Sequence, residues 1–132
     1  MKKVLIIDRD NSTNSIIAEA LINKYLNNIK AYSKAIKEPK EIDPSTIKAL
    51  ELQEAWSDEY YSKGFDELLD IDFDLVVVVD DIEEDISDRF PKRVGIISVI
   101  FNEPDRDSLD SFIEVTQNIK EKLLPIVRKK LS

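Results

Sequence analysis

The 132-residue sequence contains no cysteine and no histidine. These absences exclude disulfide bonds, zinc sites built from cysteine and histidine, and catalysis by a thiolate or an imidazole. The longest apolar runs, such as residues 75–79, are far too short to span a bilayer. The apolar run that follows Lys2 and Lys3 ends at Asp8, which is too short for a signal peptide, so we expect a cytoplasmic protein without a membrane partner.

Basic side chains are the minority, with 19 Lys and Arg against 27 Asp and Glu, and the formal net charge is -8. This charge repels DNA and RNA on average, and no stripe of Lys and Arg offsets it, so we expect no nucleic-acid partner. The basic run at residues 128–130 is simply explained as positive charge at the C-terminus of a helix. Because 42% of the residues are hydrophobic, residues 1–132 are expected to form one ordered domain.

Hydrophobic patterning predicts four strands that alternate with helices. The uniform apolarity of residues 75–79 indicates a strand buried on both faces, as in a parallel sheet. The strands are expected at residues 4–7, 29–35, 75–79 and 94–100, and the helices at residues 16–25, 44–52 and 65–69 and from 107 onward. The alternation predicts an α/β fold with three layers, in which helices flank a four-stranded parallel sheet.

Local signals refine the expected helix ends. Asp43 followed by Pro44 predicts an N-cap and a first helical residue. Ser15 is the expected N-cap of the first helix, with Ser12 and Asn11 as alternatives. Pro125 is expected to kink or end the last helix.

Acidic residues follow three of the predicted strands. Asp8 and Asp10 follow the first strand, Asp80 and Asp81 follow the third, and Glu103 follows the fourth. The carboxyl ends of parallel strands meet at one edge of a sheet, where α/β proteins bind their ligands. These residues are either solvated loop residues without a role or ligands of a hard cation such as Mg2+ or Ca2+, which takes oxygen ligands.

Two aspartate motifs suggest phosphoryl chemistry, but neither is specific. Asp8-Arg9-Asp10 after a strand resembles the nucleophile loop of haloacid-dehalogenase phosphatases, yet this pattern is common by chance in a chain this acidic. Receiver domains of response regulators also place an aspartate after their first and third strands. Here the interval between Asp8 and Asp80 is too long for a receiver, and no Lys-Pro pair follows a fifth strand.

Another resemblance covers nearly the whole chain. Its segments are Met1–Ile7, Asn11–Ser12, Ser15, Ala18–Leu21, Tyr32–Ser33, Glu38–Pro39, Ile42, Pro44, Ile47–Leu50, Ser62–Lys63, Asp66–Leu69, Asp72–Val77, Phe101 and Pro104. In order and spacing they resemble low-molecular-weight protein tyrosine phosphatases and, more closely, the thioredoxin-coupled arsenate reductases that share the same frame. The resemblance implies a four-stranded parallel sheet and an oxyanion-binding loop after the first strand.

The resemblance also shows what this loop has lost. In the family a cysteine thiolate opens the loop and an arginine follows six positions later; the matching positions here are Asp8 and Asn14. Asp10 stands where the family has a glycine, and Thr13 stands where it has a second cysteine. The loop positions that remain as in the family are Asn11, Ser12 and Ser15.

The other catalytic positions have changed as well. The two redox cysteines of arsenate reductases correspond to Asp80 and Ser87, and the Asp-Pro pair of the phosphatase general acid corresponds to Glu103-Pro104. A carboxylate about 4 Å from a phosphate charge costs about 4 kcal/mol at an effective dielectric constant near 20. The lost hydrogen bonds of the arginine remove about 1.5–3 kcal/mol more. We therefore expect neither family reaction.

Two hypotheses follow for the function. The first is a catalytically inactive member of this fold, a pseudoenzyme without a cofactor that acts as an interaction or regulatory module, with a protein partner or as a homodimer. Its candidate contact residues are Trp56, Tyr60 and Tyr61, because aromatic side chains anchor interfaces. The alternative is a divalent-cation-dependent enzyme or binding protein that uses Asp8, Asp10, Asp80 and Glu103.

Overall fold

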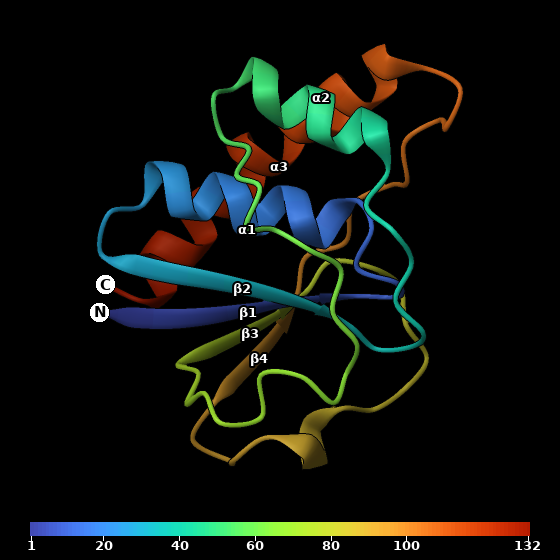
Figure 1. The fold of residues 1–132 in the computed structure, drawn as a ribbon. Helices are drawn as coiled ribbons and strands as arrows, with labels where there is room; N and C mark the ends of the chain where they lie inside the picture. Colours follow the sequence, from blue (N-terminus) through green and yellow to red (C-terminus); the bar gives the residue numbers. More distant parts are fainter.

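A four-stranded parallel sheet lies at the centre of the computed structural model, which describes residues 1–132 (Figure 1). Its strands are β1 (Lys2–Asp8), β2 (Ile29–Ala35), β3 (Leu75–Val78) and β4 (Gly95–Ser98). They lie in the order β2-β1-β3-β4, and every neighbouring pair is parallel. The predicted fold class is therefore confirmed, and the bounds of β2 agree with the prediction.

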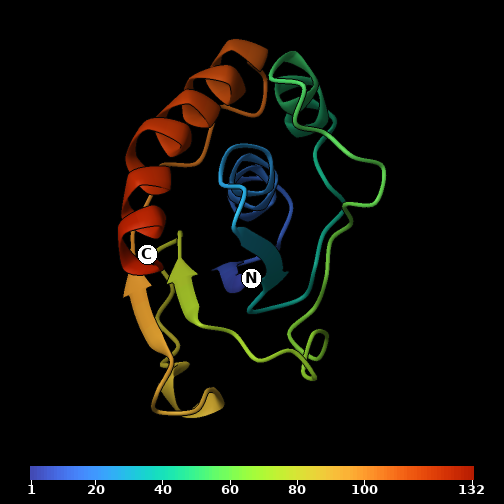
Figure 2. The same cartoon turned by 90° about the vertical axis from the view of Figure 1, so that its left-hand side faces the viewer.

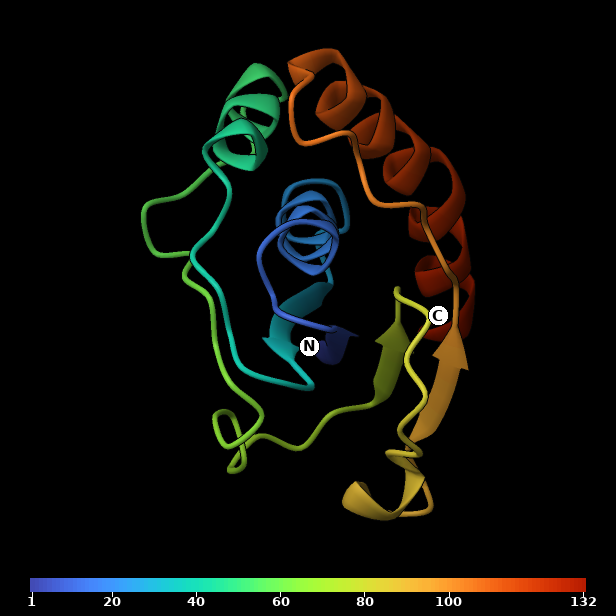
Figure 3. The same ribbon diagram turned by 90° about the vertical axis from the view of Figure 1, so that its right-hand side faces the viewer.

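Three helices lie on one side of the sheet: α1 (Asn14–Tyr25), which packs on β1 and β2, and α2 (Pro44–Leu52) and α3 (Leu109–Lys130), which pack on α1. Figures 2 and 3 show α1 nearly end-on, enclosed by the sheet, α2 and α3. This position explains why α1 is apolar on nearly all sides, with Ile16, Ile17, Ala20 and Leu21 buried against sheet residues such as Val77. None of the helices has the length and apolarity needed to cross a membrane.

Irregular chain forms the layer on the other face of the sheet, together with the short 3-10 helix η1 (Ser87–Arg89). Leu5 and Val76 from the sheet pack there against Phe73, Ile86 and Val94. The second hydrophobic core is thus closed by loops rather than by regular helices.

The helix predicted at residues 65–69 is wrong, because this segment forms turns. Leu68 has a left-handed backbone with φ 65°. The buried Lys34 side chain donates its Nζ to the carbonyl oxygens of Phe65 and Glu67, both at 3.0 Å. Five residues are too few to nucleate a stable helix alone, and Lys34 satisfies carbonyls that a helix would use.

The structure confirms the predicted start of α2 and differs from the predictions at the start of α1 and the end of α3. Asp43 caps α2, accepting from the N–H of Ser45 at 2.9 Å, as predicted. Ser15 does not cap α1, because the N-cap residue is Thr13, without a side-chain cap bond. Pro125 does not end α3, which continues to Lys130; Pro125 is exposed, and the buried stripe of the helix continues beyond it.

Candidate functional site

The loop between β1 and α1 is buried at the carboxyl edge of the sheet. Residues 11–15 are each at most 5% exposed, and Asp8 is 3% exposed. Asn11 has φ 54°, a left-handed conformation that asparagine tolerates better than most residues. The loop therefore has a tightly determined shape, and the atoms that determine it come largely from its own side chains.

Asp8 directs its carboxylate into the loop. Its Oδ1 accepts from the N–H of Asn11 at 2.7 Å, and its Oδ2 accepts from the N–H of Ser15 at 2.9 Å. The Ser15 N–H belongs to the first turn of α1, where backbone donors have no partner within the helix. Asp8 thus connects the end of β1 to the start of α1 and satisfies that donor from outside the helix.

Burial raises the pKa of the Asp8 carboxyl from 3.8 to about 7, and the negative charge of Asp10 acts in the same direction. Hydrogen bonds from Ser15 and Asn11 lower the pKa and offset part of this effect. The Asp8 carboxyl group therefore gains or loses its proton near neutral pH. Asp8 occupies the position that matches the family cysteine.

Asn11 is the centre of a buried polar network. Its Nδ2 donates to the hydroxyl oxygens of Ser15 at 2.7 Å and Ser33 at 2.9 Å, and its Oδ1 accepts from the N–H of Lys63 at 2.8 Å. The Ser33 hydroxyl in turn donates to Glu19, whose Oε1 lies 3.9 Å from Lys63 Nζ. Sequence reasoning used Glu19, Ser33 and Lys63 only as frame residues and missed their network, because only the fold brings them together.

Asn14 occupies the position that matches the family arginine. Its Nδ2 points to the carbonyl oxygens of Phe101 at 3.4 Å and Asn102 at 3.3 Å. Its Oδ1 is buried and has no hydrogen-bond partner. Asn14 links the start of α1 to the segment after β4, but it brings no positive charge into the loop.

An arginine that sequence reasoning missed lies beside the loop. Arg106 Nη1 donates to the hydroxyl of Thr13 at 2.7 Å and lies 3.3 Å from Asp43 Oδ2, while its Nη2 lies 2.6 Å from Glu103 Oε2. The guanidinium is therefore engaged by two carboxylates. The spacing of Glu103 and Arg106 was the one signal that could have indicated this pair.

The predicted cation ligands share one edge but have separate partners. Asp10 accepts from the Ser12 hydroxyl at 2.6 Å, and Asp80 accepts from the N–H of Asp81 at 2.8 Å. Burial raises the pKa of Glu103, and the nearby Arg106 lowers it. No group of three or more Asp and Glu side chains is arranged to hold a metal ion. The structure thus brings these residues to one edge without assembling a cation site.

Comparisons with known proteins give matches over nearly the whole chain. A profile of the family described as low molecular weight phosphotyrosine protein phosphatase matches residues 3–131. An arsenate reductase solved in its phosphate-binding state has a TM-score of 0.83 at 23% identity, with 98% of each chain covered. Vibrio vulnificus Wzb in complex with benzylphosphonate has a TM-score of 0.80 at 19% identity, with 97% of this chain and 98% of that chain covered.

A third solved structure, the YwlE arginine phosphatase from Geobacillus stearothermophilus, has a TM-score of 0.76 at 16% identity. The match covers 99% of this chain and 93% of that chain. A comparison with curated proteins gives no match. At these identities the structural likeness establishes the fold.

Replacing Asn11 tests the buried network. Asn11→Ala removes three side-chain hydrogen bonds and leaves buried partners unsatisfied, so the free energy of unfolding should fall by on the order of 3 kcal/mol. Asn11→Gly should lose about 1 kcal/mol less, because glycine adopts the left-handed backbone without strain. Urea unfolding of both variants provides the measurement. Equal losses, or losses well below 1 kcal/mol, would contradict this role of Asn11.

The proton on Asp8 predicts a specific pH dependence of stability. Because the folded pKa is raised to about 7, this proton stabilises the fold fully below pH 3.8, and the stabilisation is lost as the pH rises through 7. Between pH 5 and 8 the wild type should lose about 2–3 kcal/mol relative to Asp8→Asn, which keeps the neutral form at all pH values. The exposed control Glu83→Gln should follow the wild type. Parallel wild-type and Asp8→Asn curves would show that Asp8 is not buried as described.

Proposed function

The chain belongs to the low molecular weight phosphotyrosine protein phosphatase family, and we propose that it is a non-catalytic member that acts in the cytoplasm as an interaction or regulatory module. The observation that carries this proposal is the inward carboxylate of Asp8. A family reaction needs a reactive atom at that position, accessible to a ligand in the loop. Asp8 is 3% exposed, and both of its oxygens accept backbone N–H groups.

The charges around the loop support the same proposal. A bound phosphate or arsenate needs positive charge, which the family arginine would supply. Asn14 is neutral, and Arg106 is held by Asp43 and Glu103 at the mouth of the loop. With Asp10 also at the mouth, an oxyanion would meet more negative than positive charge there.

Glu103, at the general-acid position, does not restore the chemistry. Burial raises the pKa of Glu103, and the ion pair with Arg106 at 2.6 Å offsets only part of this effect. A general acid also needs a nucleophile to complete the reaction, and the loop offers none that a substrate can reach. The residues that remain from the family are those that determine the shape of the loop.

A groove beside the loop supports an interaction role. It has a volume of about 560 Å3 and is lined in part by Pro39, Ile42, Trp56, Tyr60 and Tyr61. Trp56 and Tyr60 pack against the main hydrophobic core, whereas Tyr61 is 53% exposed. Of the three aromatic residues predicted as contacts, Tyr61 is therefore the one most available to a partner.

Activity assays with a restored loop test the proposal. The wild type should hydrolyse no aryl phosphate and reduce no arsenate above the buffer rate, and phosphate should not raise its melting temperature. The control is Asp8→Cys combined with Asn14→Arg, which returns the thiolate and the positive charge and should bind phosphate. A ligand present at about 100 times its dissociation constant adds about 2.7 kcal/mol of stability, so binding would be visible as a shift of several degrees. Turnover by the wild type, or its stabilisation by phosphate, would contradict the proposal.

A further inference from the structure

The outer edge of β4 carries unused backbone hydrogen-bonding groups. β4 is the last strand of the sheet and pairs only with β3. The pairing extends beyond Ser98, because the N–H groups of Val99 and Phe101 donate to the carbonyl oxygens of Val78 and Val79 at 2.9 and 3.2 Å. In a parallel ladder alternate residues face the neighbouring strand, so the N–H and C=O groups of Ile96, Ser98 and Ile100 point outward.

These outward groups have no partner within the chain. No hydrogen bond outside the regular helices and strands uses the N–H or C=O of Ile96, Ser98 or Ile100. Figures 2 and 3 show β4 at the margin of the sheet, with α3 above it and no strand beyond it. Ile100 is also 56% exposed, so this edge presents apolar surface as well as free backbone groups.

The opposite edge of the sheet, β2, is covered. The Asn23 side chain accepts from the N–H of Ala31 at 2.8 Å and donates to its C=O at 3.2 Å, and the Lys63 carbonyl accepts from the N–H of Ala35 at 2.8 Å. Proteins usually protect an edge by such cover, or with charged residues or proline in the strand. Residues 94–102 contain neither a charge nor a proline. The edge at β4 is therefore suited to pairing with another strand.

We propose that β4 pairs antiparallel with β4 of a second copy of this chain, which joins the two sheets across a two-fold axis at Ser98. Lys92 and Arg93 precede the uncharged run, and Glu103 and Asp105 follow it. An antiparallel second copy brings the basic end of one strand to the acidic end of the other, whereas a parallel copy would bring like charges together. With the axis at Ser98, Ile96 lies opposite Ile100 of the second copy, and Arg93, in the turn before β4, comes near Glu103 of the second copy.

The ion pairs that these charges make within the chain leave room for a partner from a second copy. Glu103 binds Arg106 through Oε2 at 2.6 Å, so its Oε1 can accept from Arg93 of the second copy. Arg93 lies 3.5 Å from Asp72, and the two side chains are 58% and 90% exposed. Exposed pairs of this kind contribute little to stability, so exchanging Asp72 for a carboxylate of a second copy costs little.

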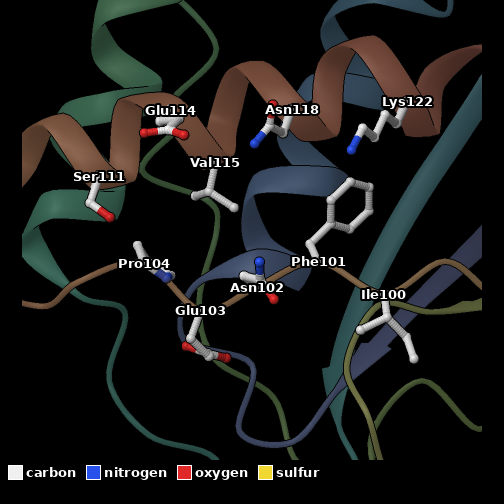
Figure 4. A pocket seen from close by; sticks show the side chains of 10 residues that line it. All are labelled: Ile100, Phe101, Asn102, Glu103, Pro104, Ser111, Glu114, Val115, Asn118 and Lys122. Atoms are coloured by element: carbon white, nitrogen blue, oxygen red, sulfur yellow. The ribbon is translucent and has the colours of Figure 1, made fainter.

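The charges on the surface of α3 next to this edge are ordered in the same direction as the charges of the strand. A groove of about 200 Å3 separates the segment of residues 100–104 from α3. Figure 4 shows Glu114 toward the Pro104 end of this groove and Lys122 toward the Ile100 end. The acidic and basic ends of the helix surface therefore match those of the strand, and both favour the antiparallel orientation of a second copy.

This inference goes beyond the proposed function and does not depend on the loss of catalysis, since the β4 edge lies outside the loop at residues 8–15. A chain that proves monomeric would leave the activity assays unaffected, and turnover by the wild type would leave the association measurements unaffected.

Cross-linking at the two-fold axis tests the proposal directly. The chain has no cysteine, so a single introduced cysteine reports only its own approach to the same residue of a second copy. Ser98→Cys should form a disulfide-linked dimer under mild oxidation, whereas Lys48→Cys, which is also exposed but lies on α2, should not. Equal cross-linking of the two variants, or none at position 98, would overturn the proposal.

Sedimentation velocity over a concentration series measures the pairing without a cross-link. The wild type should change from monomer to dimer, and Ser98→Pro should weaken the dimer on the order of tenfold, because it removes an outward N–H that the pairing with β3 does not use. Should this proline disturb the fold in a melting experiment, Ile100→Lys is the second variant. The control Leu52→Lys, at an exposed apolar residue on α2, should leave association unchanged. A wild type that is monomeric at every concentration would overturn the proposal.

Charge exchange tests the antiparallel register. Arg93→Glu and Glu103→Arg should each weaken the dimer about fivefold, because each places like charges opposite one another. The double variant should recover wild-type association, since it restores opposite charges with their positions exchanged. Failure of the double variant to recover would overturn the register and the proposal that depends on it.

Discussion

The two hydrogen bonds that the Asp8 carboxylate accepts are the interactions on which the buried loop depends. They join the last residue of β1 to the N–H of Asn11 and to the first turn of α1. Held in its left-handed conformation, Asn11 can reach Ser15, Ser33 and Lys63 with one side chain. Through these contacts the end of β1, the start of α1, the middle of β2 and the segment near residue 63 are fixed relative to one another.

The same two hydrogen bonds hold the carboxylate of Asp8 at the position where the family has its nucleophile. A carboxylate in this position satisfies backbone donors, and Asp8 is only 3% exposed. Its environment also explains the pKa near 7, because burial opposes the charge more strongly than two backbone N–H groups favour it. The loop therefore remains well ordered while the nucleophile and the arginine are absent. The uncovered edge at β4 lies outside this network, and the pairing that we propose there approaches the loop only through Glu103, which binds Arg106.

Sequence patterns predicted the parts of the fold that depend on local signals. The uniform apolarity of residues 75–79 indicated a parallel sheet, and Asp43 with Pro44 indicated the start of α2. Contacts between distant residues were not predictable in this way: Lys34 binds carbonyl oxygens of the segment where a helix was expected, and Arg106 reaches Thr13. The family resemblance pointed to the segment that connects β1 and α1, but the inward direction of the Asp8 carboxylate depends on backbone geometry that no spacing reveals. For the same reason, the sequence showed that acidic residues share one edge but not that each has its own partner.

Direct titration of the Asp8 carboxyl group tests the central claim, and 13C NMR of its side-chain carbon can follow it with and without phosphate. A buried carboxylate held by the loop should titrate with a pKa of about 7, and phosphate should not change that value. A pKa near 3.8, the ordinary value for aspartate, would show that the side chain is solvated rather than held inside the loop. A pKa that changes with phosphate would show that the loop still binds an oxyanion next to Asp8, which would contradict the account.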